Sequence, residues 1–271
     1  MKYKTALTIA GSDPSGGAGM QADLKTFSAL AVYGTSAIVA IVDENTQGVY
    51  GVHPVPVDFV AGQIRSVIDD IGADAVKIGM LHSSELILTV LNSLKSYPSI
   101  KNIVLDPVMV ATSGDPLLEP EAVDTLRSSL LPYCRVITPN LPEASILLGK
   151  TIDHQDQLED AARELSTING ANISVMLKAG HLECDKLTDI FYNAETRNVL
   201  RLTSNKINTR NTHGTGCTMS SAIAAYLAKG ASLDNAARLA KDYINAAIEA
   251  GARYEIGKGH GPVHHFYNLW K

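Results

Sequence analysis

Residues 5–20 read TALTIAGSDPSGGAGM, which joins a short apolar run to a loop rich in glycine. The run Thr5–Ala10 predicts a buried strand that stops at Gly11. From Met20 onward, apolar side chains recur at the three- and four-residue spacing of a helix. A strand, a glycine loop and a helix in this order predict the beginning of an α/β fold.

The same alternation continues along the chain. Further strands are predicted at Ser36–Val42, Ala75–Ile78, Ile103–Leu105, Val136–Thr138, Ile173–Leu177, Asp189–Tyr192 and Val199–Leu202. Helices are predicted between most of them, and the last two span about 217–228 and 232–250. Continuously apolar strands that alternate with helices predict a mostly parallel central sheet covered on both faces. No linker rich in Pro, Gly or Ser divides the chain, so residues 1–271 are predicted to form a single domain.

The composition excludes several classes of protein. Of the 271 residues, 45% are hydrophobic and 19% are charged, which excludes global disorder, and the net charge of -5 argues against non-specific binding of nucleic acid. Cys134, Cys184 and Cys217 form no C-x-x-C pair, which excludes a zinc ribbon. The longest markedly apolar stretch, Ala29–Val42, is shorter than the roughly 20 residues that cross a membrane. We expect a soluble, cytoplasmic protein with no membrane or nucleic-acid partner.

The first glycine loop allows two interpretations. Gly17–Ala22 matches the G-x-G-x-x-A pattern of dinucleotide-binding folds, and Asp43 and Glu44 follow at about the offset of a ribose-binding acid. However, Gly11–Gly16 separates this match from the strand, whereas a Rossmann turn places its first glycine directly at the strand end. The loop also lacks the Lys-Ser/Thr pair of a Walker A loop. We therefore favour a glycine loop that closes over a ligand.

A second glycine segment, residues 211–218, reads NTHGTGCT and precedes an alanine-rich helix. Glycines at a helix start let backbone N–H groups converge on an anion, which the helix dipole also attracts. Cys217 lies at this helix start, so its thiol pKa is predicted to be lowered. The alternative is a structural helix start with an inert buried cysteine.

Polar side chains follow several predicted strands, at the edge where parallel sheets bind ligands. Asp106 and Lys178 could serve phosphate or metal there, or be ordinary loop residues. Asn140 and Glu143 flank a helix start, where they could cap the helix or hold a hydrated Mg²⁺. The segment 257–265, GKGHGPVHH, is a weak metal motif, and we interpret it as a loop that closes beside the active site.

Taken together, the motifs identify a family. The chain resembles hydroxymethylpyrimidine/phosphomethylpyrimidine kinases of thiamine biosynthesis, in the ribokinase-like superfamily, nearly from end to end. The resemblance rests on ALTIAGSDPSGGAGMQADLKTFSAL, KIGML, VLDPVM, ITPNLPEA, NTHGTGCT and GKGHGPVHHF. It implies a ribokinase-like kinase domain over residues 1–271, with ATP and Mg²⁺ as cofactors. A homodimer is likewise implied by the resemblance alone.

The resemblance also implies which residues form the site. The pyrimidine would bind near Gly11, Asp23, Glu44 and Met80. Phosphates would bind at Thr212, His213, Gly214, Thr215, Gly216 and Lys178. Mg²⁺ would be organised by Asp106, Asn140 and Glu143. Cys217 and Lys178 would be catalytic, with Cys217 beside the substrate hydroxyl.

One residue departs from the expected pattern. The resemblance predicts Gln where this chain has Glu44 in VDENT. Gln both donates and accepts hydrogen bonds, whereas an ionised Glu only accepts, so Glu44 requires a protonated ring or its own proton.

Other functions remain open at this point. The runner-up is a pyridoxal/pyridoxine kinase or an enzyme of dual specificity. A catalytically silent sensor would not need the intact set of Lys178, Asn140, Glu143 and Cys217, and a dehydrogenase leaves NTHGTGC unexplained.

Overall fold

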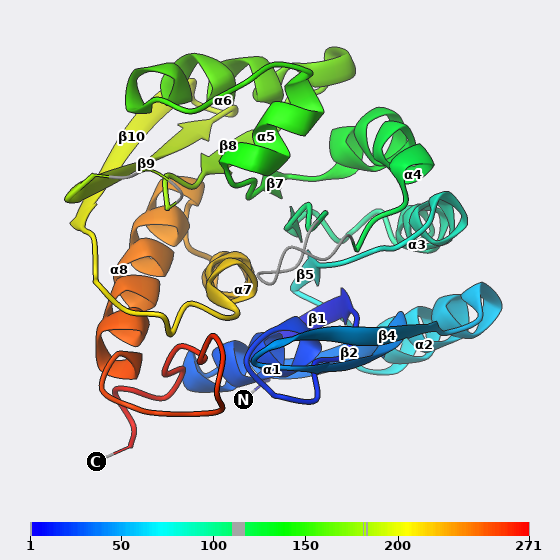
Figure 1. Cartoon of the computed structure of the whole chain (residues 1–271). Helices are drawn as coiled ribbons and strands as arrows, with labels where there is room; N and C mark the ends of the chain where they lie inside the picture. The colour runs from blue at the N-terminus through cyan, green and yellow to red at the C-terminus, as the bar shows by residue number, and fades with distance from the viewer. Residues whose placement is uncertain (1, 110–116, 181, 183, 271) are drawn as a thin grey trace.

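The computed structural model describes residues 2–109, 117–180, 182 and 184–270, and its centre is an eight-stranded sheet (Figure 1). The strand order is β10-β9-β8-β7-β6-β5-β1-β2. The strands are β1 (Thr5–Ala10), β2 (Tyr33–Ile38), β5 (Ala75–Ile78), β6 (Ile103–Leu105), β7 (Val136–Ile137), β8 (Ser174–Leu177), β9 (Lys186–Asn193) and β10 (Asn198–Asn205). Strands β1, β2, β5, β6, β7 and β8 pair in parallel, and β9 is antiparallel to both of its neighbours. The predicted mostly parallel sheet is confirmed.

Helices cover both faces of this sheet, and each face has its own apolar core. One face packs against α1 (Gly19–Ala29), α7 (Thr215–Ala228) and α8 (Leu233–Gly251). The other packs against α2 (Val57–Asp70), α3 (Ser84–Lys95), α4 (Pro120–Thr125), α5 (Leu141–Leu148) and α6 (Leu158–Ser166). Short turns of 3-10 or π helix lie at Leu126–Leu130, Leu131–Tyr133, Gln155–Gln157 and Ile168–Gly170. Among the described residues, no helix combines the length and apolar character needed to cross a bilayer.

The predicted strand Ser36–Val42 is wrong in one respect, because the chain changes sheets within it. β2 ends at Ile38, and β3 (Ala40–Asn45) pairs with β4 (Gly48–Pro54) in a separate two-stranded antiparallel sheet. At the junction, the Val39 N–H still donates to Ala10 of β1, while the Val39 carbonyl accepts from Val55. The hairpin then lies beside the first glycine loop, because Ser12 N–H donates to the Ala40 carbonyl.

A buried ion pair joins the sheet to the helices of one face. Lys77 of β5 lies 2.8 Å from an oxygen of Asp23 of α1, and both side chains are completely buried. The Asp23 carboxylate also accepts from the hydroxyls of Thr8 in β1, at 2.6 Å, and Ser221 in α7, at 2.7 Å. Burial alone lowers the pKa of Lys77, but the attraction of Asp23 more than reverses this and raises it above its usual range. The Asp23 carboxylate thus links α1 to β1, β5 and α7.

We predict that Asp23→Asn lowers the free energy of unfolding by about 3–5 kcal/mol, since it leaves the Lys77 ammonium buried without a counter-charge. Urea unfolding measures this change. The matched control is Asp124→Asn, which breaks an exposed pair with Arg127 and should cost at most about 1 kcal/mol. Equal losses in the two variants would contradict the role given to Asp23.

Candidate active site

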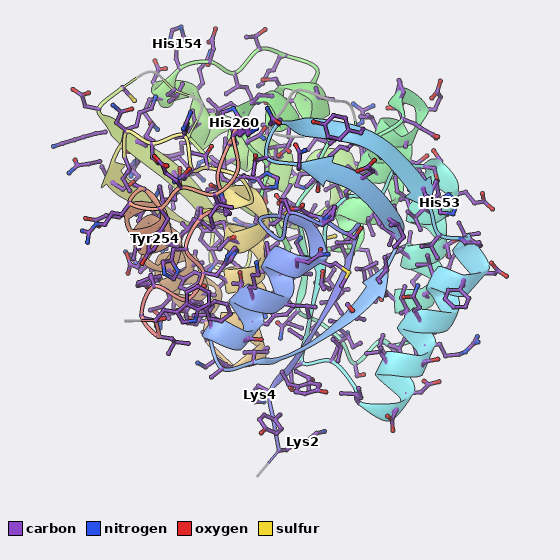
Figure 2. The ribbon with its side chains drawn as sticks, turned by 60° about the horizontal axis from the view of Figure 1, so that its bottom comes forward. Lys2, Lys4, His53, His154, Tyr254 and His260 are labelled. Atoms are coloured by element: carbon purple, nitrogen blue, oxygen red, sulfur yellow. The ribbon has the colours of Figure 1, made fainter. Side chains whose placement is uncertain are left out.

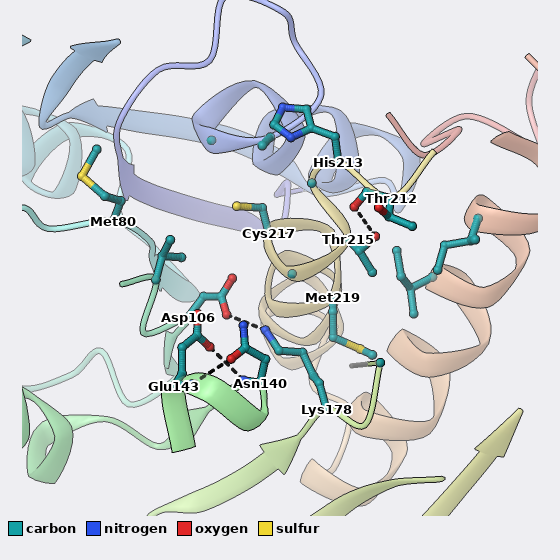
Figure 3. Close-up of a pocket in the computed structure, with 18 of the residues that line it drawn as sticks. Met80, Asp106, Asn140, Glu143, Lys178, Thr212, His213, Thr215, Cys217 and Met219 are labelled. Atoms are coloured by element: carbon teal, nitrogen blue, oxygen red, sulfur yellow. Dashed lines mark hydrogen bonds and ion pairs between the residues drawn. The ribbon is translucent and has the colours of Figure 1, made fainter. Parts of the chain in front are cut away.

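A cavity of about 650 Å³ lies at the carboxyl ends of the parallel strands (Figure 3). Its floor is lined by the residues that follow five adjacent strands in the sheet. In spatial order these are Lys178 after β8, Asn140 after β7, Asp106 after β6, Met80 after β5 and Gly11 after β1. Glu44 of the β3–β4 hairpin and the start of α7 complete the cavity. The structure therefore gathers most of the predicted site into one pocket.

The start of α7 is built to receive an anion. Gly214 adopts a φ of +79°, in the left-handed region, and a Cβ there would lie only 1.8 Å from the carbonyl oxygen of Gly17. The following residues Thr215–Cys217 begin the helix, where first-turn N–H groups have no partner within the helix. Thr215 holds the turn through a 2.7 Å bond from its hydroxyl to the Thr212 carbonyl. Backbone donors and the helix dipole here favour a phosphate.

Lys178 brings a positive charge to the same place. A Cβ on Gly216 would lie 3.2 Å from Lys178 Nζ, so the ammonium and the helix start face each other. Lys178 Nζ also lies 3.0 Å from Asp106 Oδ1, which accepts a further bond from the Thr138 hydroxyl at 2.8 Å. Burial raises the pKa of Asp106, but the ammoniums of Lys178 and Lys77 outweigh it, so the pKa is lowered and the carboxyl is ionised.

Asn140 and Glu143 form a capping box at the start of α5. The Asn140 side chain accepts from the Glu143 N–H, and the Glu143 carboxylate accepts from the Asn140 N–H, both at 2.8 Å. The structural interpretation of this pair is therefore confirmed. Burial raises the pKa of Glu143 to about 7, with Lys178 opposing and Asp106 reinforcing the rise. Both side chains still line the cavity, so a metal role stays a prediction.

The opposite corner of the pocket is suited to an organic ring. Gly11, Val42 and Met80 line it with apolar surface, and the Met80 methyl lies 2.8 Å from where a Cβ on Gly11 would be. Glu44 is the titratable group there, and it is half-buried. Burial raises the pKa of Glu44 to about 7, with the nearby charge of Asp13 adding to the rise.

The prediction that Asp23 binds the substrate is wrong. It does not line the cavity, and its carboxylate is enclosed by Lys77, Thr8 and Ser221 beneath the floor. Asp23 was expected near the substrate from the family resemblance alone, and its position on α1 buries the side chain instead.

The predicted lowering of the Cys217 pKa is wrong. Cys217 lines the pocket at the start of α7, but burial raises its pKa to about 12, although the ammonium of Lys77 opposes the rise. The dipole at the helix start is outweighed because the thiolate would lie in a poorly hydrated site, with Asp23 and Asp106 nearby. The thiol is therefore neutral in the ligand-free protein.

Two parts of the site were not predicted from the sequence. Asp13 is completely buried yet joins the two glycine loops, since its carboxylate lies 2.8 Å from His213 Nε2. The far end of the pocket is walled by apolar side chains from β9, from the segment after β10, and from α7 and α8, namely Leu187, Ile207, Met219, Ile244 and Ile248. Asp13 could have been found from its place between the glycines, whereas the apolar wall has the same pattern as core.

A phosphate site of backbone N–H groups and a lysine, facing a separate corner for an organic ring, is the arrangement of a phosphotransferase on a ribokinase-like fold. Comparison with known proteins agrees. The chain belongs to the phosphomethylpyrimidine kinase family, whose sequence model matches residues 13–264.

Individual relatives are similar over nearly their whole length. The hydroxymethylpyrimidine/phosphomethylpyrimidine kinase of Rhizobium meliloti is 50% identical, with 98% of each chain covered. The pyridoxal kinase of Bacillus subtilis, solved as an ADP complex, is 39% identical with a TM-score of 0.88, covering 99% of this chain and 100% of that one. The pyridoxal kinase of Staphylococcus aureus with AMP-PCP and pyridoxal is 36% identical with a TM-score of 0.88, covering 99% and 96%.

We predict that iodoacetamide modifies Cys184 first, because this cysteine is exposed while Cys134 is buried. At pH 8, Cys217 should react on the order of 1,000-fold more slowly than a free thiol, since so little of it is ionised. Peptide mass spectrometry of a time course measures both rates. Fast labelling of Cys217 with an apparent pKa below that of a free thiol would restore the original prediction.

Proposed function

We propose that the protein transfers the γ-phosphoryl group of ATP to 4-amino-5-hydroxymethyl-2-methylpyrimidine and then to the resulting monophosphate, in thiamine biosynthesis. The observation that carries this proposal is the division of one cavity into two ends. One end has Gly11, Glu44 and Met80, and the other has Lys178 and the start of α7. An alcohol held at the first end faces phosphates held at the second.

The nucleotide would lie along the later strands. Its phosphates would accept from the N–H groups of Gly216 and Cys217, with Lys178 adding a positive charge. The apolar wall of Ile244 and Ile248 suits the adenine ring. Phosphoryl transfer depends mainly on alignment and charge neutralisation, which backbone donors and a lysine supply.

Cys217 would contact the substrate hydroxyl as the catalytic residue. Because its thiol is neutral in the ligand-free protein, it does not provide a ready-made base. A loose transition state needs little nucleophilic assistance from the attacking oxygen, so the hydroxyl proton can leave late in the transfer, to an oxygen of the transferred phosphoryl group or to water. The predicted role of Cys217 therefore becomes contact and orientation, with the sulfur accepting from the hydroxyl.

The residues at the floor fit a hydrated Mg²⁺. Asp106 offers an ionised carboxylate and Glu143 a second carboxyl, and oxygen is the donor that this ion prefers. Asn140 adds an amide oxygen, which would reach the ion directly or through one of its waters. When bound, the ion would neutralise charge on the phosphates and would keep several of its waters.

A pyridoxal kinase is the second candidate, since two structural neighbours at 36–39% identity have that name. The two substrates share a ring that carries a hydroxymethyl group, and the pocket corner has apolar surface for either ring.

We also propose that the protein works as a single kinase domain and as a homodimer. Support for the dimer comes from the β3–β4 hairpin and the adjoining α2, which expose large apolar side chains: Ile41 at 49%, Tyr50 at 63%, Val52 at 41% and Phe59 at 65%. A cytoplasmic location likewise stays a prediction.

The experiment is an assay of ADP release with the hydroxymethylpyrimidine, its monophosphate and pyridoxal, with products identified by ³¹P NMR. We predict formation of the pyrimidine diphosphate and a higher kcat/KM for the pyrimidine than for pyridoxal. Preference for pyridoxal would support the second candidate, and no ADP release with any of the three would contradict both.

Gly216→Ala tests where the reaction takes place. Its added methyl would lie 3.2 Å from both Lys178 Nζ and Asp106 Oδ2, so turnover should fall on the order of 100-fold. Gly180→Ala is the matched control, because Gly180 also lines the pocket but a Cβ there meets nothing within 4 Å. Equal activity in the two variants would contradict the placement of the phosphates.

A further inference from the structure

Asp13 is fastened to both glycine loops by its buried carboxylate. Within its own loop it accepts from the N–H groups of Ser15 at 2.7 Å, Gly17 at 3.0 Å and Ala18 at 2.6 Å. From the second loop, His213 Nε2 lies 2.8 Å from the same carboxylate. Three backbone donors and an imidazole all favour the ionised form, and they hold the pKa of Asp13 well below its usual range despite burial.

Glu44 is the third member of this cluster. One carboxyl oxygen of Glu44, one of Asp13 and a ring nitrogen of His213 all lie within 4.8 Å of one another. Of the three, Glu44 is the one that shares the pocket corner with Gly11 and Met80. Asp13 comes from the first loop, His213 from the second and Glu44 from the hairpin, so three separate elements meet here.

Other charged groups near Glu44 lie on the hairpin and on the C-terminal segment. Asp43, the neighbour of Glu44 on β3, is exposed. The C-terminal segment contacts the hairpin turn through the N–H groups of Gly259 and His260, which donate to Thr46. The His260 ring lies 3.3 Å from the Arg210 carbonyl, and Lys258 is exposed; Figure 2 labels His260 at this end of the hairpin. Asp13 and His213 are thus the titratable groups that face Glu44 from the packed loops.

Two carboxyl groups this close do not both ionise readily. Asp13 is stabilised as the anion by its three backbone donors and His213, so of the two carboxyl groups it is Glu44 that takes the proton. We propose that Asp13 is a positioning residue for substrate specificity: held as the anion by its backbone donors and His213, it keeps the carboxyl of Glu44 protonated, while the direct effect of His213 on Glu44 opposes this, and the protonated carboxyl reads the edge of a 4-aminopyrimidine ring. This inference rests on the proposed function and specifies how its substrate is recognised.

A protonated carboxyl is matched to this ring. When the ring binds, the O–H of Glu44 turns from Asp13 to donate to a ring nitrogen, while its carbonyl oxygen accepts from the neighbouring amino group, which gives two parallel hydrogen bonds. Pyridoxal has a ring nitrogen without an adjacent amino group, so it can form only one of them. The same proton thereby favours the pyrimidine over pyridoxal.

Each substitution moves the pH midpoint in a direction set by the charge that it removes. Glu44 has a pKa raised to about 7, so kcat/KM for the pyrimidine should fall as the pH rises through about 7. Asp13→Asn removes the negative neighbour and should move this midpoint down by roughly one unit. His213→Gln removes the neighbour that lowers the pKa of Glu44 and should move the midpoint up by a similar amount. A merely structural role would not move the two variants in opposite directions.

The test is a pH titration of the Glu44 carboxyl by ¹³C NMR in the ligand-free protein, together with pH profiles of kcat/KM for the pyrimidine and for pyridoxal. We expect opposite shifts in Asp13→Asn and His213→Gln by both methods, and a profile in Glu44→Gln that no longer changes near pH 7. The preference for the pyrimidine over pyridoxal should fall at least 10-fold between pH 6 and pH 8.5 in the unaltered protein. If Asp13→Asn does not fold, the upward shift of the Glu44 midpoint in His213→Gln tests the proposal by itself, and an unmoved midpoint contradicts it.

Unmoved midpoints in an enzyme that phosphorylates the pyrimidine would overturn this inference alone. Shifted NMR midpoints in a protein without pyrimidine kinase activity would instead overturn the proposed function, together with the specificity that we assign to the cluster.

Discussion

The site depends on the contact between the two glycine loops. Gly214 approaches the carbonyl of Gly17 so closely that a Cβ would lie 1.8 Å from its oxygen, and only a glycine with φ near +79° fits there. The contact places the start of α7, where phosphate binds in our proposal, against the loop that borders the pyrimidine corner. The Asp13–His213 bond crosses the same junction, so position and protonation are fixed together. The C-terminal segment reinforces the junction, because the His213 N–H donates to the Gly261 carbonyl.

Two lysine–aspartate pairs near the pocket differ in burial, and this difference gives one a structural role and leaves the other able to bind a ligand. Lys77 and Asp23 are completely enclosed, and every oxygen of that carboxylate has a partner, so the pair holds the fold together. Lys178 and Asp106 form a similar pair at 3.0 Å, but Lys178 remains 14% exposed and faces the start of α7. The second pair can therefore exchange partners with a ligand, whereas the first cannot.

Much of the fold could be predicted from periodicity. The bounds of β1, β5 and β6 agree with the predicted runs, because a strand buried on both faces is mostly apolar; Lys77 in β5 and the threonines in β1 are the exceptions. The change of sheet at Val39 was not predictable in this way, since the run Ser36–Val42 stays apolar across both sheets. What divides it is a pair of backbone hydrogen bonds to Ala10 and Val55, which lie far away in the sequence.

The site residues that directly follow strands were predicted correctly. Properties that depend on burial of a side chain were not. Gly11, Met80, Asp106, Asn140 and Lys178 reach the pocket because each follows a parallel strand. Two other outcomes depended on packing that no local pattern reveals: the inward direction of Asp23 and the raised pKa of Cys217.

The central claim is that one backbone contact supports both halves of the site. Calorimetric binding of the hydroxymethylpyrimidine and, separately, of AMP-PCP to Gly214→Ala tests it most directly. Gly72→Ala is the control, because Gly72 also has a positive φ, of 80°, but a Cβ there meets nothing within 4 Å. We predict that Gly214→Ala weakens both ligands at least 10-fold, while Gly72→Ala keeps both affinities. Loss of one affinity with the other intact would contradict the claim.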